Sequence, residues 1–139
     1  MSETAPTPSL EVGQSAERVR TVTDADIRAF AALSGDNNPV HLDDDYASRS
    51  IFKGRVAHGM FAGALISAAL GADLPGPGAV YLSQRLEFRR PIRPGDEVTV
   101  RVTVSSVEPP RAVLQTQVLV RGKLAVDGEA VVALPLARS

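Results

Sequence analysis

Residues 59–72 read GMFAGALISAALGA, a stretch in which Ser67 is the only strongly polar side chain. The stretch is well below the roughly 20 apolar residues that a membrane span requires. A helix at the surface of a protein would show a polar face, and this segment has none. Residues 59–72 therefore predict a helix that other parts of the chain must cover.

The cover is predicted as a set of β-strands. Residues 97–107, EVTVRVTVSSV, alternate as in a half-buried strand. Residues 79–91, 112–121 and 124–135 predict three more strands, with short turns between the last four, and residues 16–22 predict a weaker first strand. The side chains expected to face the core are Val98, Val100, Val102 and Val104 in one strand, and Val80, Leu82, Leu86 and Phe88 in another. We expect the four strands after the apolar helix to form a meander.

The first half of the chain is less regular. Residues 23–35, TDADIRAFAALSG, predict a helix that is capped by Thr23 and stopped by Gly35. Its apolar stripe comprises Ile27, Phe30, Ala31 and Leu33. Residues 36–58 contain Pro39 and show no sustained period, so we expect a long segment with short helical turns. Segments of that length within a compact domain are usually functional or disordered.

The composition narrows the classes of protein. The length of 139 residues fits one domain, predicted over 10–139, after a flexible tail at 1–9 that does not resemble a secretory signal. Lys and Arg number 15 against 16 Asp and Glu, which gives no net field toward nucleic acid or an anionic membrane. The chain has no cysteine and two histidines, so thiolate chemistry is excluded, a metal site is not expected, and a cytoplasmic location fits.

These elements predict an α+β fold in which a curved antiparallel sheet wraps round a central apolar helix. Such a sheet has two open edges. Because edges rich in valine tend to pair with another strand, we expect a homodimer with a continuous sheet.

Three stretches carry a further likeness: AFAALSGDNNPVHLDDDYA at 29–47, VAHGMFAGALISAAL at 56–70 and LEFRRPIRPGDEVTV at 86–100. Together they resemble the MaoC-like (R)-specific enoyl-CoA hydratases, a family with the hot-dog fold, over about residues 10–135. The hydratase motif of that family corresponds here to Asp36, Asn38, Pro39 and His41. The resemblance implies dimerisation and the addition of water to trans-2-enoyl-CoA to give (R)-3-hydroxyacyl-CoA. It also implies that no metal or redox cofactor takes part, since coenzyme A enters with the substrate.

The residues can serve this chemistry. Asp36 can accept a proton from water, and His41 can orient that water and exchange a proton with C2; which of the two protonates C2 stays open. Asn38 can fix the shape of the turn between them. Gly59 opens the apolar helix, where free N–H groups favour the negative charge of an enolate oxygen, and the resemblance also assigns it to the oxyanion hole.

Other residues receive supporting roles. The family pattern suggests that Ser67 contacts Asp36, although a helical serine can instead bond a carbonyl one turn back. His58 is expected to be a helix-start or core residue rather than a catalyst, and as a substrate-binding residue it would help to shape the substrate entrance. Leu70 or Val132 would form the floor of the acyl site. A basic rim for the phosphates of coenzyme A is expected from Arg85, Arg89, Arg90 and Arg93, with Arg89 and Arg90 nearest the substrate; a solvated strand end is the alternative for each.

Other functions remain open at this point. A (3R)-hydroxyacyl-ACP dehydratase would run the reverse reaction on carrier-protein thioesters, and acyl-CoA thioesterases also use hot-dog domains. A non-catalytic acyl-CoA-binding dimerisation module is a third alternative, but it would not need both Asp36 and His41. The length of the acyl chain stays open, as does the pathway, which could supply polyhydroxyalkanoate monomers or degrade fatty acids.

Overall fold

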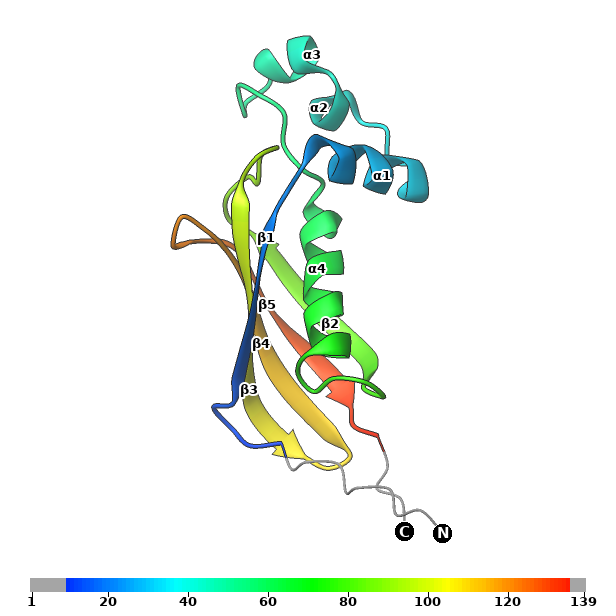
Figure 1. Cartoon of the computed structure of the whole chain (residues 1–139), viewed down its shortest axis with the longest axis vertical. Helices are drawn as coiled ribbons and strands as arrows, with labels where there is room; N and C mark the ends of the chain where they lie inside the picture. Colours follow the sequence, from blue (N-terminus) through cyan, green and yellow to red (C-terminus); the bar gives the residue numbers. More distant parts are fainter. Residues whose placement is uncertain (1–9, 136–139) are drawn as a thin grey trace.

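The computed structural model describes residues 10–135, so the predicted tail at 1–9 lies outside the described residues. Five antiparallel strands form one sheet in the order β1-β3-β4-β5-β2, and α4 lies along one face of it (Figure 1). The strands are β1 (Ser15–Thr21), β2 (Val80–Phe88), β3 (Glu97–Glu108), β4 (Arg111–Val120) and β5 (Lys123–Ala133). The helices are α1 (Asp24–Ser34), α2 (Pro39–Leu42), α3 (Asp44–Ser48) and α4 (Gly59–Ala72). The predicted α+β class is confirmed.

The core lies between α4 and the sheet. The four valines predicted to face inward on β3 are all 2% exposed or less, which confirms the alternation. Ile66 of α4 and Leu114 of β4 are both fully buried against them. Burial of side chains of this size stabilises a fold by about 1.5–3 kcal/mol each relative to exposure. Helix and sheet therefore hold each other in place.

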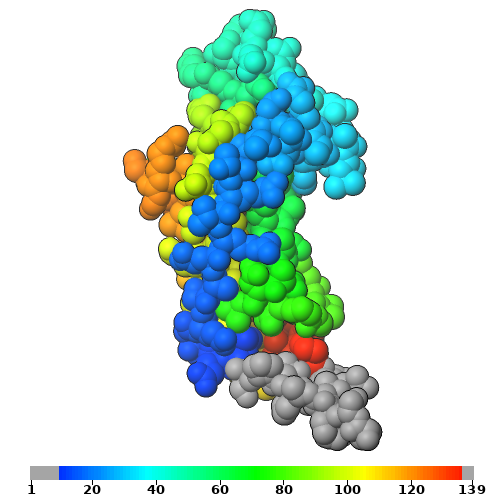
Figure 2. All heavy atoms as spheres, in the orientation of Figure 1, coloured from blue at the N-terminus to red at the C-terminus, as the bar shows by residue number. Residues whose placement is uncertain are grey.

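The other side of α4 is uncovered. Met60 is 60% exposed, and Ala64, Ser67 and Ala68 are exposed as well. Atoms of α4, in green, are visible at the surface in Figure 2. The sheet thus covers only part of the helix, and the expectation that the chain wraps α4 on all sides is not met within one subunit.

The position of β2 differs from the prediction. Strands β3, β4 and β5 form a meander of three, and β2 pairs with β5 at the far edge. The prediction of a four-strand meander was wrong. Turn residues show where a strand ends, but they do not show which strand the next one pairs with.

The alternation of β2 also differs. A bulge between Tyr81 and Ser83 shifts the register, so that Tyr81, rather than Val80, lies opposite the buried Val132. Val80 and Leu82 are 55% and 46% exposed, whereas Phe88, beyond the bulge, lies opposite the buried Val126 on the predicted face. A bulge inserts one residue and changes the face of all side chains on one side of it. An alternating pattern read from sequence does not register such an insertion.

Helix α1 begins and ends as predicted. Thr23 and Asp26 form a capping box, and Gly35 adopts a left-handed φ of 80° as the C-cap. Leu33, however, is 86% exposed and does not belong to the buried stripe. The short helical turns expected within residues 36–58 are α2 and α3, and Asp43 caps α3.

Within residues 10–135, no helix is both long and apolar enough to cross a bilayer.

Candidate active site

The segment between α1 and α2 is shaped by its own side chains. A carboxylate oxygen of Asp36 accepts a hydrogen bond from the Asn38 N–H at 3.2 Å, and the Asn38 side-chain oxygen accepts one from the Val40 N–H at 3.2 Å. Asn38 is thereby the N-cap of α2, with Pro39 at its first position. The structure supports the predicted role of Asn38 in shaping this turn.

His41 lies on α2 and is 8% exposed. Its Nδ1 lies 2.8 Å from the main-chain oxygen of Val56. Because a carbonyl oxygen only accepts hydrogen bonds, Nδ1 carries the proton, and the Nε2 of the neutral ring is left with a lone pair. Within the described residues Nε2 has no hydrogen-bond partner, and His41 lines a cavity. This nitrogen can accept a proton from a molecule in the cavity or orient it.

His58 holds the two predicted catalytic residues together. It is 3% exposed, and its Nε2 donates to the main-chain oxygen of Asp36 at 3.0 Å. Its ring stacks on that of His41, with centroids 3.8 Å apart and planes at 28°, and Phe30 packs on it at 4.9 Å. Its Nδ1 is buried and has no partner among residues 10–135. His58 contacts the Asp36 backbone and the His41 ring, both within one subunit.

Asp36, His41 and His58 each place one potential metal-ligand atom within 4.8 Å of the others. Whether they suit a metal ion depends on the direction of their lone pairs. Two His ligands must aim their lone pairs at one point. Here the rings are stacked, and each uses one nitrogen to donate to a carbonyl oxygen. The arrangement suits fixed orientation of the two rings better than convergence on an ion.

The cavity beside these residues has a volume of about 650 Å³. Asp36, His41 and His58 lie on its wall, and the remainder is largely apolar. Its apolar lining includes Phe30, Phe52, Ala62, Phe88, Ile92 and Val126. A cavity of this size and lining can hold a small apolar chain next to a few fixed polar groups.

Gly59 opens α4 and lines the same cavity. His58 occupies the N-cap position without a side-chain cap, and the Gly59 N–H has no hydrogen-bond partner within the described residues. A Cβ at position 59 would lie 2.8 Å from the Phe88 ring, so a larger residue would push that ring away. The free N–H and the helix dipole make this point favourable for a negatively charged oxygen.

Ser67 and the two predicted floor residues lie elsewhere. Ser67 is exposed on the uncovered side of α4, and no hydrogen bond joins it to Asp36 in the described part of the chain. Leu70 and Val132 are 3% and 1% exposed within the core, and neither lines the cavity. For the two residues on α4 the reason is distance. Ser67 and Leu70 follow Gly59 by eight and eleven positions, so they lie about 12 and 16 Å further along the helix.

The four arginines of the predicted rim differ in their partners. Arg89 lies on the cavity wall but pairs with Glu87 at 2.8 Å and Asp127 at 3.4 Å. Arg85 also faces Glu87, at 3.7 Å, and Arg93 donates to a main-chain oxygen at 2.6 Å. Arg90 lines the cavity and has no ion pair within the part of the chain that the structure describes. Arg90 is the rim cation that remains available to an anion.

Sequence reasoning missed Phe30 and Val56 as parts of the site. Phe30 was assigned only to the apolar stripe of α1, yet its ring packs on His58. Val56 acts through its main-chain oxygen, which every residue type possesses. The identity of residue 56 therefore carries no signal that could reveal this contact.

Known proteins resemble the chain over most of its length. Residues 7–127 match the MaoC-like domain family. An (R)-specific enoyl-CoA hydratase of Rhodospirillum rubrum is 46% identical over 91% of this chain and 89% of its own length. An (R)-specific enoyl-CoA hydratase of Aeromonas caviae is 47% identical, covering 91% and 97%. More distant relatives include a 3-hydroxyacyl-[acyl-carrier-protein] dehydratase of Solanum lycopersicum, 33% identical over 96% of this chain and 83% of its own length.

Solved structures agree in fold. The (R)-hydratase from A. caviae involved in PHA biosynthesis superposes with a TM-score of 0.88 at 47% identity, covering 91% of this chain and 98% of that one. The unliganded R-hydratase PhaJ1 of Pseudomonas aeruginosa also gives a TM-score of 0.88, at 47% identity, and covers 96% and 90%. The predicted hot-dog fold is thereby confirmed. This chain belongs to the MaoC-like domain family.

Proposed function

We propose that this protein is an (R)-specific enoyl-CoA hydratase, a hydro-lyase that adds water to trans-2-enoyl-CoA to give (R)-3-hydroxyacyl-CoA. The observation that carries the proposal is the placement of Asp36 and the free Nε2 of His41 in one apolar cavity with the N–H of Gly59. The similarity to curated hydratases at 46–47% identity supports the same reaction.

The side chains fill the roles that hydration requires. The water oxygen forms a bond to C3, the C2–C3 double bond opens, and the electron pair moves onto the thioester oxygen. Asp36 or His41 removes a proton from the water, and one of the two delivers a proton to C2 as the electron pair of the enolate returns to form the C2–H bond and restores the thioester C=O. Since Nδ1 of His41 is held by Val56, the ring presents its Nε2 lone pair to the water in a fixed direction.

Gly59 stabilises the enolate that forms during this step. Its N–H points from the start of α4, where the helix dipole also favours negative charge. Removing one such donor typically lowers kcat about 10²–10³-fold. The reaction as proposed uses no metal or redox cofactor.

Substrate binding divides between the cavity and its mouth. The acyl chain lies against Ala62, Val126 and neighbouring apolar residues rather than against Leu70 or Val132. Arg90, which keeps its charge available, binds phosphate of coenzyme A more favourably than Arg89, whose partners are already Glu87 and Asp127. His58 serves by positioning Asp36 and His41.

A second copy of the chain covers the exposed side of α4. A groove of about 550 Å³ runs between α4 and β2 and includes Ser67. Met60, Tyr81 and Leu82 line this groove and are 60%, 39% and 46% exposed, and Val80 of the same strand is 55% exposed. Apolar side chains gathered at a sheet edge favour pairing with another subunit. The proposed homodimer would be split by Leu82→Glu, measured as a halved mass in sedimentation.

The strongest alternative is a dehydratase for 3-hydroxyacyl carrier-protein thioesters. It shares the Asp and His chemistry, and the tomato relative bears that name at lower identity. The two functions differ at the mouth of the cavity, because a carrier protein presents its own surface whereas coenzyme A presents nucleotide phosphates to Arg90. A higher kcat/KM for crotonyl thioesters of a carrier protein than for crotonyl-CoA would favour the alternative.

The proposal is tested by incubating the protein with crotonyl-CoA and determining the configuration of the product. We expect (R)-3-hydroxybutyryl-CoA, with Asp36→Asn and His41→Ala each lowering kcat by about 10²-fold or more. Asp45→Asn is a matched control, because Asp45 is exposed and its carboxylate pairs, among residues 10–135, only with Arg49. Unchanged turnover in Asp36→Asn or His41→Ala would refute the assignment, and release of free coenzyme A would indicate a thioesterase.

A further inference from the structure

Helix α2, which carries His41, is only four residues long. The last carbonyl groups of a helix have no partner within it, and in so short a helix this concerns all of them. Here each of the four finds a donor outside the helix. Pro39 O accepts from the Asp43 N–H at 2.9 Å and Val40 O from the Val56 N–H at 3.3 Å.

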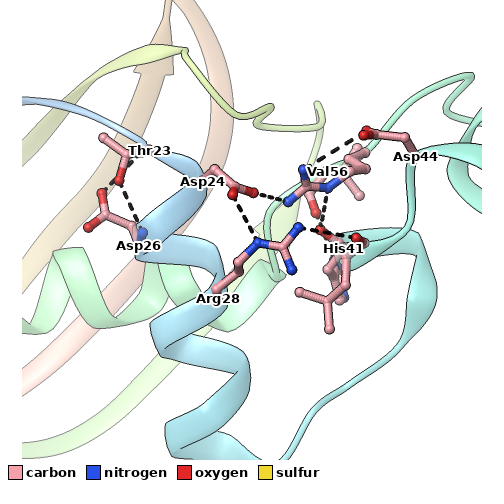
Figure 3. A network of polar contacts seen from close by, with 9 residues as sticks. Thr23, Asp24, Asp26, Arg28, His41, Asp44 and Val56 are labelled. Atoms are coloured by element: carbon pink, nitrogen blue, oxygen red, sulfur yellow. Dashed lines mark hydrogen bonds and ion pairs between the residues drawn. The ribbon is translucent and has the colours of Figure 1, made fainter.

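The remaining two carbonyl groups accept hydrogen bonds from arginine side chains, in the polar network around Asp24, Arg28 and His41 that Figure 3 shows. The Nε of Arg55 donates to His41 O at 2.8 Å, while Arg28 reaches Leu42 O only at 3.5 Å. Both arginines also bind Asp24 at the start of α1, Arg28 at 2.9 Å and Arg55 through Nη2. Asp24 thus links two guanidinium groups that face the same short helix.

The two arginines differ in burial. The side chain of Arg55 is 9% exposed, whereas that of Arg28 is 54% exposed. A hydrogen bond from a buried charged group to a carbonyl is stronger and more directional than one in contact with water. Arg55 does not line the cavity, so it does not contact the substrate proposed above.

We propose that Arg55 is a positioning residue for His41, held in place by Asp24. Arg55 holds the main-chain oxygen of His41, and its neighbour Val56 holds the ring through Nδ1. Backbone and ring of one residue are thereby fixed by two consecutive positions. This arrangement keeps the proton on Nδ1 and directs Nε2 toward the cavity. The inference rests on the proposed hydratase function for its catalytic consequence only.

The first test compares Arg55→Lys with Arg28→Lys. A lysine keeps the charge, but its single ammonium group cannot bind Asp24 and the His41 carbonyl with the two separate nitrogens that Arg55 uses. We expect Arg55→Lys to lower kcat for crotonyl-CoA by about 10- to 100-fold with little change in KM, since misplacement by about 1 Å has effects of this size. Arg28→Lys should retain kcat within about twofold.

The second test measures the tautomers of the histidine rings and does not depend on activity. The chain has two histidines, so ¹⁵N spectra of the imidazoles contain two sets of signals. The structure assigns the proton to Nδ1 in His41 and to Nε2 in His58. In Arg55→Lys we expect the His41 signals to shift toward a mixture of the two tautomers, whereas Arg28→Lys leaves them unchanged.

Asp24→Asn provides a variant that keeps Arg55 and removes the nearer of its two charged partners, since Asp44 lies 3.9 Å from the Arg55 guanidinium. Asp24 is half exposed, so the substitution leaves no buried gap. We expect a smaller fall in kcat than in Arg55→Lys and a shift of the His41 signals in the same direction. This variant decides the question if Arg55→Lys does not fold.

The outcomes separate the two proposals. Wild-type kcat and unshifted His41 signals in Arg55→Lys, or equal losses in Arg55→Lys and Arg28→Lys, would overturn the role of Arg55. An inactive wild-type protein whose His41 signals still respond to Arg55→Lys would refute the hydratase function and leave the positioning role intact.

Discussion

The sheet with α4 and the segment of residues 36–58 hold their residues by different means. Between the sheet and α4, Ile66 and Leu114 are placed by apolar contacts that depend on volume and shape. In the segment, His41 and His58 are placed by single hydrogen bonds to main-chain oxygens. Apolar cores accept substitutions of similar volume, whereas a polar contact is lost when its donor is changed. Stability and function should therefore respond to different residues.

The largest effect is expected at Gly128 on β5, which lies opposite Leu86 of β2. A Cβ at position 128 would lie 1.9 Å from the main-chain oxygen of Arg85, so Gly128→Ala forces β2 away from β5. We expect a loss of about 4 kcal/mol or more in the free energy of unfolding. Denaturant titration measures it, with Gly71→Ala as a control because a Cβ there meets nothing within 4 Å.

Ile66→Ala should cause the next largest loss in the free energy of unfolding. Ile66 is fully buried between α4 and the sheet, and its truncation leaves a cavity. We expect the free energy of unfolding to fall by about 2–5 kcal/mol. The kcat of the protein that remains folded should stay within about twofold, because the polar contacts of the 36–58 segment are retained. A loss of kcat without a loss of stability would contradict the distinction between the two regions.

Substitution of His58 should lower kcat more than it lowers stability, the opposite of what is expected for Ile66→Ala. His58→Phe keeps a ring between Phe30 and His41 but removes the donor to the Asp36 carbonyl, whereas His58→Gln can supply a side-chain N–H near the same place. We expect His58→Phe to lower kcat by about 10-fold or more, and His58→Gln to lower it less. Melting temperatures recorded beside kcat values separate the two effects, and equal activity of the two variants would argue against the donor role.

Acid should weaken the ion pairs by which Asp24 of α1 binds Arg55 and Arg28. Hydrogen bonds from Arg55, and then from Arg28, hold the pKa of the Asp24 carboxyl below its ordinary value of 3.8. A lowered folded pKa contributes stability that is present above the ordinary value and is lost as the pH falls through the folded value. The difference in melting temperature between wild type and Asp24→Asn should therefore be constant near neutral pH and shrink below pH 3.8. A difference independent of pH would be inconsistent with the ion pair.

The smallest effect is expected for Arg49→Ala. Arg49 pairs with Asp45 at 2.6 Å on α3, but the two side chains are 66% and 81% exposed. Exposed pairs of this spacing contribute about 0.3–0.5 kcal/mol. Chemical denaturation should show a change no larger than this, in contrast to the buried Arg55, whose substitution acts through His41.

Much of the site was visible in the sequence. Asp36, His41 and Gly59 do line one cavity, and Asn38 shapes the turn between the first two, because turn residues act on their own neighbours. The predicted contact of Ser67 with Asp36 is absent within residues 10–135, since helical rise carries Ser67 away from the start of α4. The uncovered side of α4 on which Ser67 lies faces the proposed second subunit.

The amino-acid sequence by itself determined the local features: the apolar α4, the alternation of β3, the caps of α1 and the turn from Asp36 to His41. These depend on residues a few positions apart, so their causes stand side by side in the chain. Tertiary structure alone decided that β2 joins β5, that a bulge reverses its faces, and that Arg55 and Val56 hold His41. Each of these contacts has a main-chain atom on at least one side, and because main-chain atoms are the same in every residue, the sequence does not mark where the partner will lie.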